Sequence, residues 1–197
     1  RSTLFPYTTL FRSTNLHMNR PILGIIGGVG PLATAYFMEA IIKKTPATTD
    51  QDHIPMIVFN DPQIPDRTAY ILDHTKPDPQ PEMVKVAQWL EEAGADYIAI
   101  ACNTAHYFYD AICKAVSIPV LNIMEETARR IAHEIGATGA VGLLATDGTI
   151  ESGVFQGYFE TEGLRTIEPD DADQRRVMSL IYQGIKANGT YDPRESS

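Results

Sequence analysis

The sequence predicts an α/β protein built on a parallel sheet. Short apolar runs at 21–27, 54–60 and 97–101 alternate with longer amphipathic segments. The apolar runs are continuous, which is typical of strands covered on both faces. Strands that alternate with helices of ten or more residues form βαβ units, in which neighbouring strands are parallel.

Each expected element follows from its local pattern. Six strands are expected, at 21–27, 54–60, 97–101, 118–121, 140–145 and 164–167. Six helices are expected, at 31–44, 82–93, 104–116, 125–135, 148–162 and 172–186. Pro31 suits a first helical turn, and Gly94 and Gly136 suit the caps that end two helices. The proline-rich stretch 61–81 predicts a connection rather than an element.

Composition excludes several classes of protein. The 197 residues are 44% hydrophobic and 21% charged, which is ordinary for a chain that folds around a core. A formal net charge of -9 opposes binding to nucleic acid or to an anionic membrane surface. No apolar run reaches the roughly 18 residues of a membrane helix. The two cysteines are too few for a disulfide framework, so a cytoplasmic protein is expected.

The chain is expected to divide into three parts. Residues 1–17 contain no acidic residue and resemble translated sequencing adapter, so we interpret them as a non-native leader that precedes Met18. A first α/β lobe is expected over 18–121. Residues 122–197 are expected to form a partial second lobe, because only about two strands remain for it and so small a lobe buries little surface. The chain is therefore interpreted as an N-terminal fragment.

The segment Ala-Cys-Asn-Thr-Ala-His at 101–106 carries the sharpest chemical signal. It lies where an apolar strand ends and a helix begins, which is where open α/β sheets bind ligands. Asn103 or Thr104 can cap that helix, and its exposed amides favour an anion, either the Cys102 thiolate or a substrate carboxylate. The alternative is a buried structural cysteine. His106 either forms a dyad with Cys102 or packs as a supporting side chain, and a lone C-x3-H offers too few ligands for a metal.

Two further features suggest anion binding. Residues 28–33 form a G-x-G-x-x-A pattern, and Asp61 ends the second strand, so a nucleotide-binding module is a competing hypothesis. Pro31 removes an amide that a phosphate would need. Arg67 follows the second strand in the proline-rich connection, where its planar guanidinium suits a carboxylate, although a solvated loop arginine would look the same.

Together these motifs resemble aspartate racemases of the cofactor-independent aspartate/glutamate racemase superfamily. The matching runs are GIIGGVGPLAT, NDPQIPDRTAYIL, ACNTAH, IMEETA, GLLATDGT and IYQGIKANG. Glutamate racemases open instead with an acidic D-S-G pattern, which residues 24–30 lack. The resemblance favours the aspartate branch.

The resemblance implies two pseudosymmetric, flavodoxin-like lobes with the active site between them, the second lobe being incomplete here. It implies that Cys102 is a catalytic base, that Asn103 and Thr104 bind the α-carboxylate, and that Arg67 and Lys186 hold carboxylates. Gly30 and Thr146 would line the cleft. A small dicarboxylic amino acid would be racemised without pyridoxal phosphate or metal, and a homodimer is expected for the full-length enzyme.

The chain departs from the family at the second catalytic cysteine. That cysteine lies in a G-C-T-E run after the last helix seen here, and the sequence stops before it. Cys113 cannot replace it, because eleven helical residues separate it from Cys102 by roughly 16 Å. A broader amino-acid racemase, a maleate-type isomerase and, less favoured, a nucleotide-binding module remain alternatives.

Overall fold

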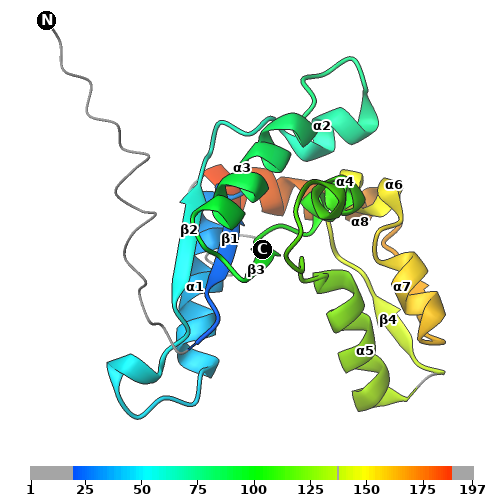
Figure 1. Cartoon of the computed structure of the whole chain (residues 1–197). Helices are drawn as coiled ribbons and strands as arrows, with labels where there is room; N and C mark the ends of the chain where they lie inside the picture. The colour runs from blue at the N-terminus through cyan, green and yellow to red at the C-terminus, as the bar shows by residue number, and fades with distance from the viewer. Residues whose placement is uncertain (1–19, 137, 188–197) are drawn as a thin grey trace, which may run out of the picture.

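The computed structural model describes residues 20–136 and 138–187. Its elements form two groups, each around a parallel sheet (Figure 1). The expectations for the leader at 1–17 and for the residues after 187 lie outside the described residues. The mixed α/β architecture with parallel strands confirms the predicted fold class.

The first sheet has the order β2-β1-β3. Its strands are β1 (Leu23–Gly27), β2 (Met56–Asn60) and β3 (Tyr97–Ile100). Ile25 of the central strand pairs with Val58 on one side and Ala99 on the other, and it is fully buried. The predicted strand at 118–121 is reduced to a parallel bridge between Ile98 and Val120. The continuous apolar runs thus belong to strands that pack in the interior, as expected.

Helices pack against this sheet. They are α1 (Pro31–Lys44), α3 (Gln80–Glu92), the 3₁₀ helix η3 (Thr104–Phe108) and α4 (Tyr109–Ala115), with a short 3₁₀ turn η2 (Asp50–Asp52). Ile26, Ile98 and Ile100 share one hydrophobic cluster with side chains of α3 and α4, including Leu90 and Ile112. This cluster fixes the strand ends from which Cys102 follows.

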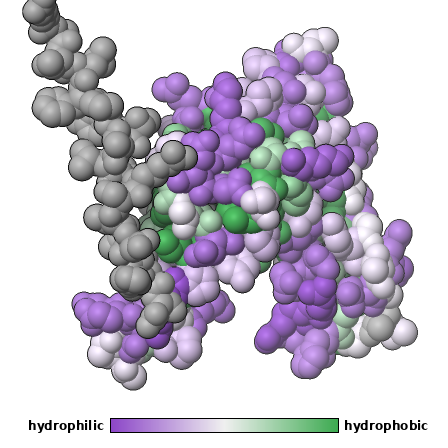
Figure 2. Space-filling view, in the orientation of Figure 1, coloured by the Kyte–Doolittle hydropathy of each residue, from purple (hydrophilic) through white to green (hydrophobic). Residues whose placement is uncertain are grey.

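The second group of elements is smaller. It contains α5 (Ile123–Ile135), β4 (Ala140–Gly142), α6 (Asp147–Ser152), α7 (Gln156–Thr161), β5 (Arg165–Ile167) and α8 (Asp171–Ser179). Strands β4 and β5 are parallel, and a separate cluster that includes Met124, Phe155 and Phe159 packs beneath them. On the exposed side of α5, Arg129 and Arg130 form ion pairs with glutamates of the same helix. Figure 2 shows this region as a hydrophilic face.

The two groups meet near α2 (Arg67–Leu72) and α6. Gly148 of α6 lies so close to Thr68 of α2 that a Cβ would sit 2.8 Å from the Thr68 Cα. The chain then runs through α8 into a π-helical segment, η4 (Leu180–Lys186), which returns behind α4 toward the first sheet (Figure 1). The end of the described chain therefore lies beside the carboxyl ends of the first strands.

Several predicted boundaries were wrong for identifiable reasons. The expected helix 104–116 is a 3₁₀ turn followed by α4, and 148–162 is broken where Gly153 adopts a left-handed φ of 65°. The expected helix 172–186 becomes π-helical after Ser179. The proline-rich connection contains an unpredicted helix, α2, because Asp66 caps it by accepting the Ala69 amide at 2.8 Å. None of the described helices has the length and apolar character needed to span a membrane.

Candidate active site

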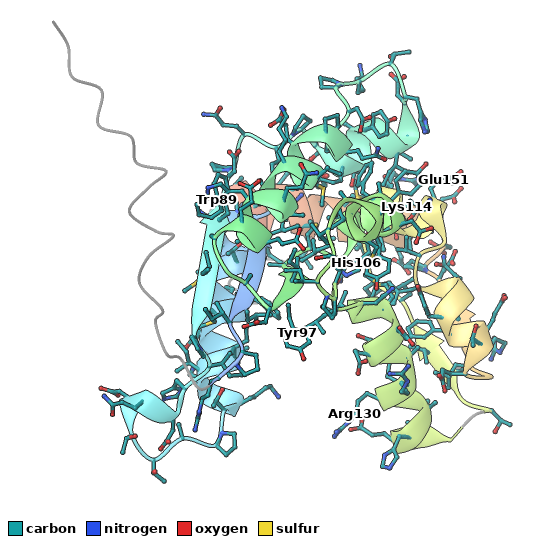
Figure 3. The ribbon with its side chains drawn as sticks, viewed as in Figure 1. Trp89, Tyr97, His106, Lys114, Arg130 and Glu151 are labelled. Atoms are coloured by element: carbon teal, nitrogen blue, oxygen red, sulfur yellow. The ribbon has the colours of Figure 1, made fainter. Side chains whose placement is uncertain are left out.

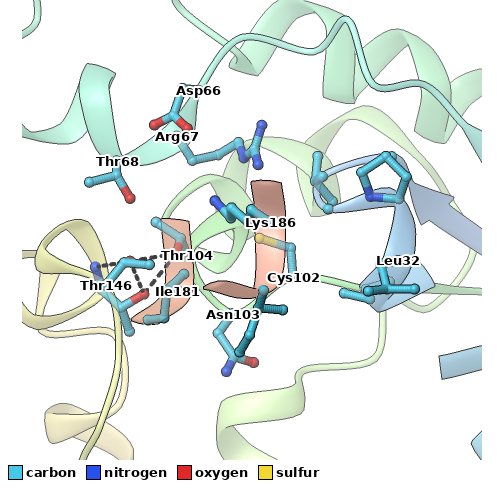
Figure 4. Close-up of a pocket in the computed structure, with 18 of the residues that line it drawn as sticks. Leu32, Asp66, Arg67, Thr68, Cys102, Asn103, Thr104, Thr146, Ile181 and Lys186 are labelled. Atoms are coloured by element: carbon cyan, nitrogen blue, oxygen red, sulfur yellow. Dashed lines mark hydrogen bonds between the residues drawn. The ribbon is translucent and has the colours of Figure 1, made fainter. Parts of the chain in front are cut away.

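A pocket of about 870 Å³ opens at the carboxyl ends of β1 and β3. This is the edge at which open parallel sheets bind ligands. The glycine-rich turn after β1 and the segment after β3 form one part of its wall, and α2 supplies another. The second group of elements contributes residues of α6 and η4 (Figure 4). The pocket is thus built from segments far apart in the sequence.

The pocket brings together every site residue that the family resemblance implies. Those residues are Gly30, Arg67, Cys102, Asn103, Thr104, Thr146 and Lys186. Cys113 is not among the lining residues, and its side chain lies on α4 beside Tyr109. Cys102 is therefore the thiol that the described part of the chain presents to the pocket.

Cys102 is half-buried and lies two residues beyond the end of β3. The helix that follows is not the long one expected, but a five-residue 3₁₀ turn. Asn103 occupies its N-cap position without a capping side-chain bond, so of the two residues expected to cap the helix, Asn103 does not. A short 3₁₀ turn also supplies a weaker dipole than a long α-helix. The cationic side chains of the described pocket lining are Arg67 and Lys186.

His106 lies outside the pocket lining and supports the segment that carries Cys102. Its side chain is 5% exposed, and burial lowers its pKa, which favours the neutral ring. Nδ1 donates to the Cys102 carbonyl oxygen at 2.9 Å, and Nε2 accepts the Ile123 amide at 3.3 Å. Both ring nitrogens bond to backbone groups, and His106 is not a lining residue. Of the two sequence hypotheses, the geometry matches the packed, supporting histidine.

Arg67 differs from its sequence-based description. The sequence placed it in a proline-rich connection, where a solvated loop arginine was the alternative to a carboxylate clamp; it instead begins α2 and is only 7% exposed. One terminal nitrogen donates to the carbonyl oxygens of Ile64 and Pro65 at 3.2 and 2.9 Å. Its Nε is buried with no hydrogen-bond partner, and Arg67 forms no ion pair with any described acidic side chain. A buried guanidinium with an unused donor is poised to receive an anion.

Three threonine hydroxyls join the two groups of elements at the pocket wall. Thr104 Oγ1 lies 2.9 Å from Thr146 Oγ1 and 2.8 Å from Thr149 Oγ1, and the latter two are 3.0 Å apart (Figure 4). All three residues are buried. Each hydroxyl can donate once and accept twice, so the triangle is satisfied internally. Thr149 was not singled out in the sequence, because its role depends on contacts across 45 positions.

Lys186 reaches the pocket from η4. Its Nζ lies 4.1 Å from the centre of the Tyr182 ring, a cation–π contact. Burial lowers the pKa of Lys186, while the charges of Asp66 and Cys102 oppose this shift. The Tyr182 hydroxyl donates to Asp66 Oδ2 at 3.3 Å. In Figure 4 the ammonium of Lys186 lies between the guanidinium of Arg67 and the sulfur of Cys102.

The geometry does not favour the nucleotide hypothesis. Gly28 has a positive φ of 82°, and a Cβ there would sit 2.2 Å from the Asp61 backbone, so close strand packing explains this glycine. The Asp61 carboxylate accepts the Gln63 amide at 2.9 Å, and Asp61 does not line the pocket. Residues 28–33 all line the pocket, with Gly30 as the residue before α1. The glycine-rich turn therefore faces this ligand space, but the acidic residue that a dinucleotide fingerprint needs does not.

The fold and the pocket are those of an α/β protein whose ligand site lies at the carboxyl edge of a parallel sheet. A model of the family described as Asp/Glu/Hydantoin racemase matches residues 26–194. The chain belongs to this family of racemases, which are isomerases.

Relatives of known name support the same class. The broad specificity amino-acid racemase RacX of Bacillus subtilis (strain 168) is 36% identical over 168 residues, covering 81% of this chain and 69% of that protein. Picrophilus torridus aspartate racemase is 35% identical with a TM-score of 0.77, covering 86% of this chain and 70% of that one. A glutamate racemase from Francisella tularensis subsp. tularensis SCHU S4, in complex with D-glutamate, has a TM-score of 0.54 at 20% identity, covering 86% and 66%. The last likeness concerns the fold alone.

Proposed function

We propose that this chain binds aspartate and acts as an aspartate racemase does, with Cys102 exchanging the Cα proton without pyridoxal phosphate or a metal. One observation carries the proposal: the buried guanidinium of Arg67 has an unpartnered Nε. Arg67 lines the same pocket as Cys102. Lys186 adds a second cation to the same pocket. A dicarboxylic amino acid offers one carboxylate for each of these groups.

The chemistry follows from these charges. The Cys102 thiolate takes the Cα proton, so that an S–H bond forms as the C–H bond breaks. The electron pair moves into the adjacent carboxylate, which gains negative charge in the transition state. Arg67 and Lys186 stabilise that charge in a partly enclosed site, where electrostatic interactions are strong. Inversion also requires a proton donor on the opposite face of Cα.

A broad-specificity amino-acid racemase is the second candidate. Two observations favour it: the similarity to RacX, and a pocket several-fold larger than aspartate. Much of the wall beyond the charged residues is apolar, including Leu32, Phe37 and Ile185. Such a wall would accommodate longer or less polar side chains.

Equilibrium binding separates the two candidates. Isothermal titration with L- and D-aspartate, glutamate, lysine and leucine would show a preference for dicarboxylates if the aspartate proposal holds. Comparable affinities across the set would favour the broad-specificity enzyme. ATP and NAD serve as controls, because binding of a nucleotide in place of the amino acids would overturn both. Exchange of the α-proton in D₂O, followed by NMR, then tests whether the bound amino acid reacts.

A further inference from the structure

Asp66 is the acidic residue of the pocket. Among the described residues that line the pocket, the charged ones are Asp66, Arg67 and Lys186. Asp66 is exposed at the rim and precedes Arg67 directly. A pocket that binds only anions gains nothing from a carboxylate beside its cations, since like charges repel the ligand. The position of Asp66 therefore calls for an explanation.

Local structure explains part of the role of Asp66 but leaves acceptor capacity. Oδ1 accepts the Ala69 amide at 2.8 Å as the N-cap of α2, and Oδ2 accepts the Tyr182 hydroxyl at 3.3 Å. A carboxylate has about four acceptor positions, so about two are left. Asp66 forms no ion pair with the described basic side chains. Its negative charge is nevertheless felt at Lys186, where it opposes the lowering of the pKa.

We propose that Asp66 binds the α-ammonium group of the amino-acid substrate. This assignment rests on the proposed function and deepens it. An acidic amino acid carries two carboxylates and one ammonium, and the pocket carries two cations and one carboxylate. Each ligand charge then has an opposite charge in the wall, which is the pattern that gives charge-based specificity. Asp66 distinguishes an amino acid from a plain dicarboxylate.

The same arrangement suits inversion at Cα. The three heavy substituents of Cα in aspartate are the ammonium, the α-carboxylate and the side chain that carries the second carboxylate. Three charged contacts would hold these groups in place while Cα passes through a planar intermediate. Only Cα and its proton then move appreciably between the two enantiomers. Asp66 should therefore contribute to the binding of L- and D-aspartate alike.

A comparison of aspartate with succinate tests the assignment, because succinate has the two carboxylates without the ammonium. Asp66→Asn keeps the N-cap acceptor and the Tyr182 contact but removes the charge. We expect this variant to raise the Kd of both aspartate enantiomers by about tenfold or more. The Kd of succinate should stay unchanged or fall, because Lys186 loses a competing anion. Isothermal titration gives both values.

Asp73→Asn is the matched control. Asp73 lies at the opposite end of the same helix, outside the pocket, and accepts the Thr75 amide at 3.0 Å. The Asp73→Asn variant should leave the ratio of aspartate to succinate affinity unchanged. It therefore distinguishes the loss of a local contact from the effect of a general change in net charge. Asp66→Ser also keeps a good N-cap residue, and it serves as a second variant if the Asp66→Asn protein folds poorly.

The outcomes are distinct. A selective loss of aspartate affinity in the Asp66 variants supports the assignment. Equal losses for aspartate and succinate, or none, would show that Asp66 only shapes the pocket and would overturn it. If the unmodified chain binds succinate but no amino acid, the assignment also fails. If it binds neither ligand, the proposed function itself fails.

Discussion

His106 holds Cys102 by its backbone: Nδ1 of the imidazole donates to the Cys102 carbonyl oxygen at 2.9 Å. Nε2 of the same ring accepts the amide of Ile123, the first residue of α5. Figure 3 shows His106 near the beginning of this helix. A carbonyl can only accept and an amide can only donate, so these partners require the neutral ring with its proton on Nδ1. A protonated ring could not accept from Ile123.

This geometry predicts a pH-dependent stability. Burial lowers the pKa of His106 below its ordinary value of 6.5, so between the two values the unfolded chain binds the extra proton. The contribution of His106 is therefore fully present above pH 6.5 and is lost as the pH falls toward the folded pKa. Urea unfolding across about pH 5 to 8 should show the free energy of unfolding decrease with acidification.

His106→Gln should reduce the dependence of the free energy of unfolding on pH, because the glutamine side chain does not titrate. His133→Gln, at an exposed position near the end of α5, is the control and should retain it. The same pH dependence in His106→Gln as in the unmodified chain would contradict the assignment to His106.

Much of the first sheet was predictable because β1 and β3 are mostly buried and β2 is largely half-buried. The run at 21–27 contains β1, and those at 54–60 and 97–101 contain β2 and β3. Continuous apolar sequence is the direct consequence of that burial, so hydropathy alone locates such strands. The strand at 140–145 was overestimated, since β4 pairs only with the three-residue β5 and Leu144 is 73% exposed.

The errors in the predicted helices have identifiable origins. The prolines in 61–81 led us to predict a connection where α2 lies. Asp66, directly before the helix, is nevertheless a typical N-cap residue. The hydropathy pattern does not report the change from a 3₁₀ turn to α4 at Tyr109, nor the π-helical turn of η4. The sequence pattern shows that a helix is present more reliably than it shows where the helix begins, ends or changes type.

For the site, sequence reasoning located residues at strand ends but not their partners. Cys102 and Gly30 follow strands of one parallel sheet, whose carboxyl ends share an edge, so their common pocket was predictable. Asp66 and Thr149 were missed, since the contacts of Asp66 with Tyr182 and of Thr149 with Thr104 join positions 116 and 45 residues apart. No local pattern encodes such pairs.

The threonine triangle predicts an energetic link between the two groups of elements. Thr104→Val keeps the shape of the side chain but removes the hydroxyl that bonds both Thr146 and Thr149. We expect the free energy of unfolding to fall by about 1–3 kcal/mol. Thr149→Val alone should cost a similar amount, and the double variant should cost less than the sum, since the two hydroxyls share one bond. Strict additivity in urea unfolding would argue against a coupled triangle.

Arg67→Lys tests the carboxylate clamp. Lysine keeps the charge but loses the planar fork and the donor at Nε, so dicarboxylate binding should weaken by about 1–3 kcal/mol. Because Arg67 is buried and bonds two backbone carbonyls, stability should also fall, by about 1–2 kcal/mol. Arg176→Lys, at an exposed position on α8, should alter neither quantity. Titration with unchanged affinity for aspartate would remove Arg67 from the binding site.

Cys102 predicts a separation between proton exchange and inversion. The described part of the chain presents one thiol to the pocket, so Cys102 can remove a proton from one face of Cα and return it to the same face. We expect the 197-residue chain to wash deuterium slowly from the α-position of one aspartate enantiomer while forming almost no inverted product. Proton NMR follows the exchange, and chiral chromatography measures the inversion.

Two cysteine variants complete this test. Cys102→Ser should abolish the exchange, because a serine hydroxyl is a far weaker acid than a thiol and supplies almost no anionic base at neutral pH. Cys113→Ser should leave it unchanged, since Cys113 lies on α4 outside the pocket. Circular dichroism of each variant distinguishes loss of the base from loss of the fold. Appreciable racemisation by the chain as given would refute the need for a second cysteine, because the described pocket would then have to supply the opposite proton donor from another side chain.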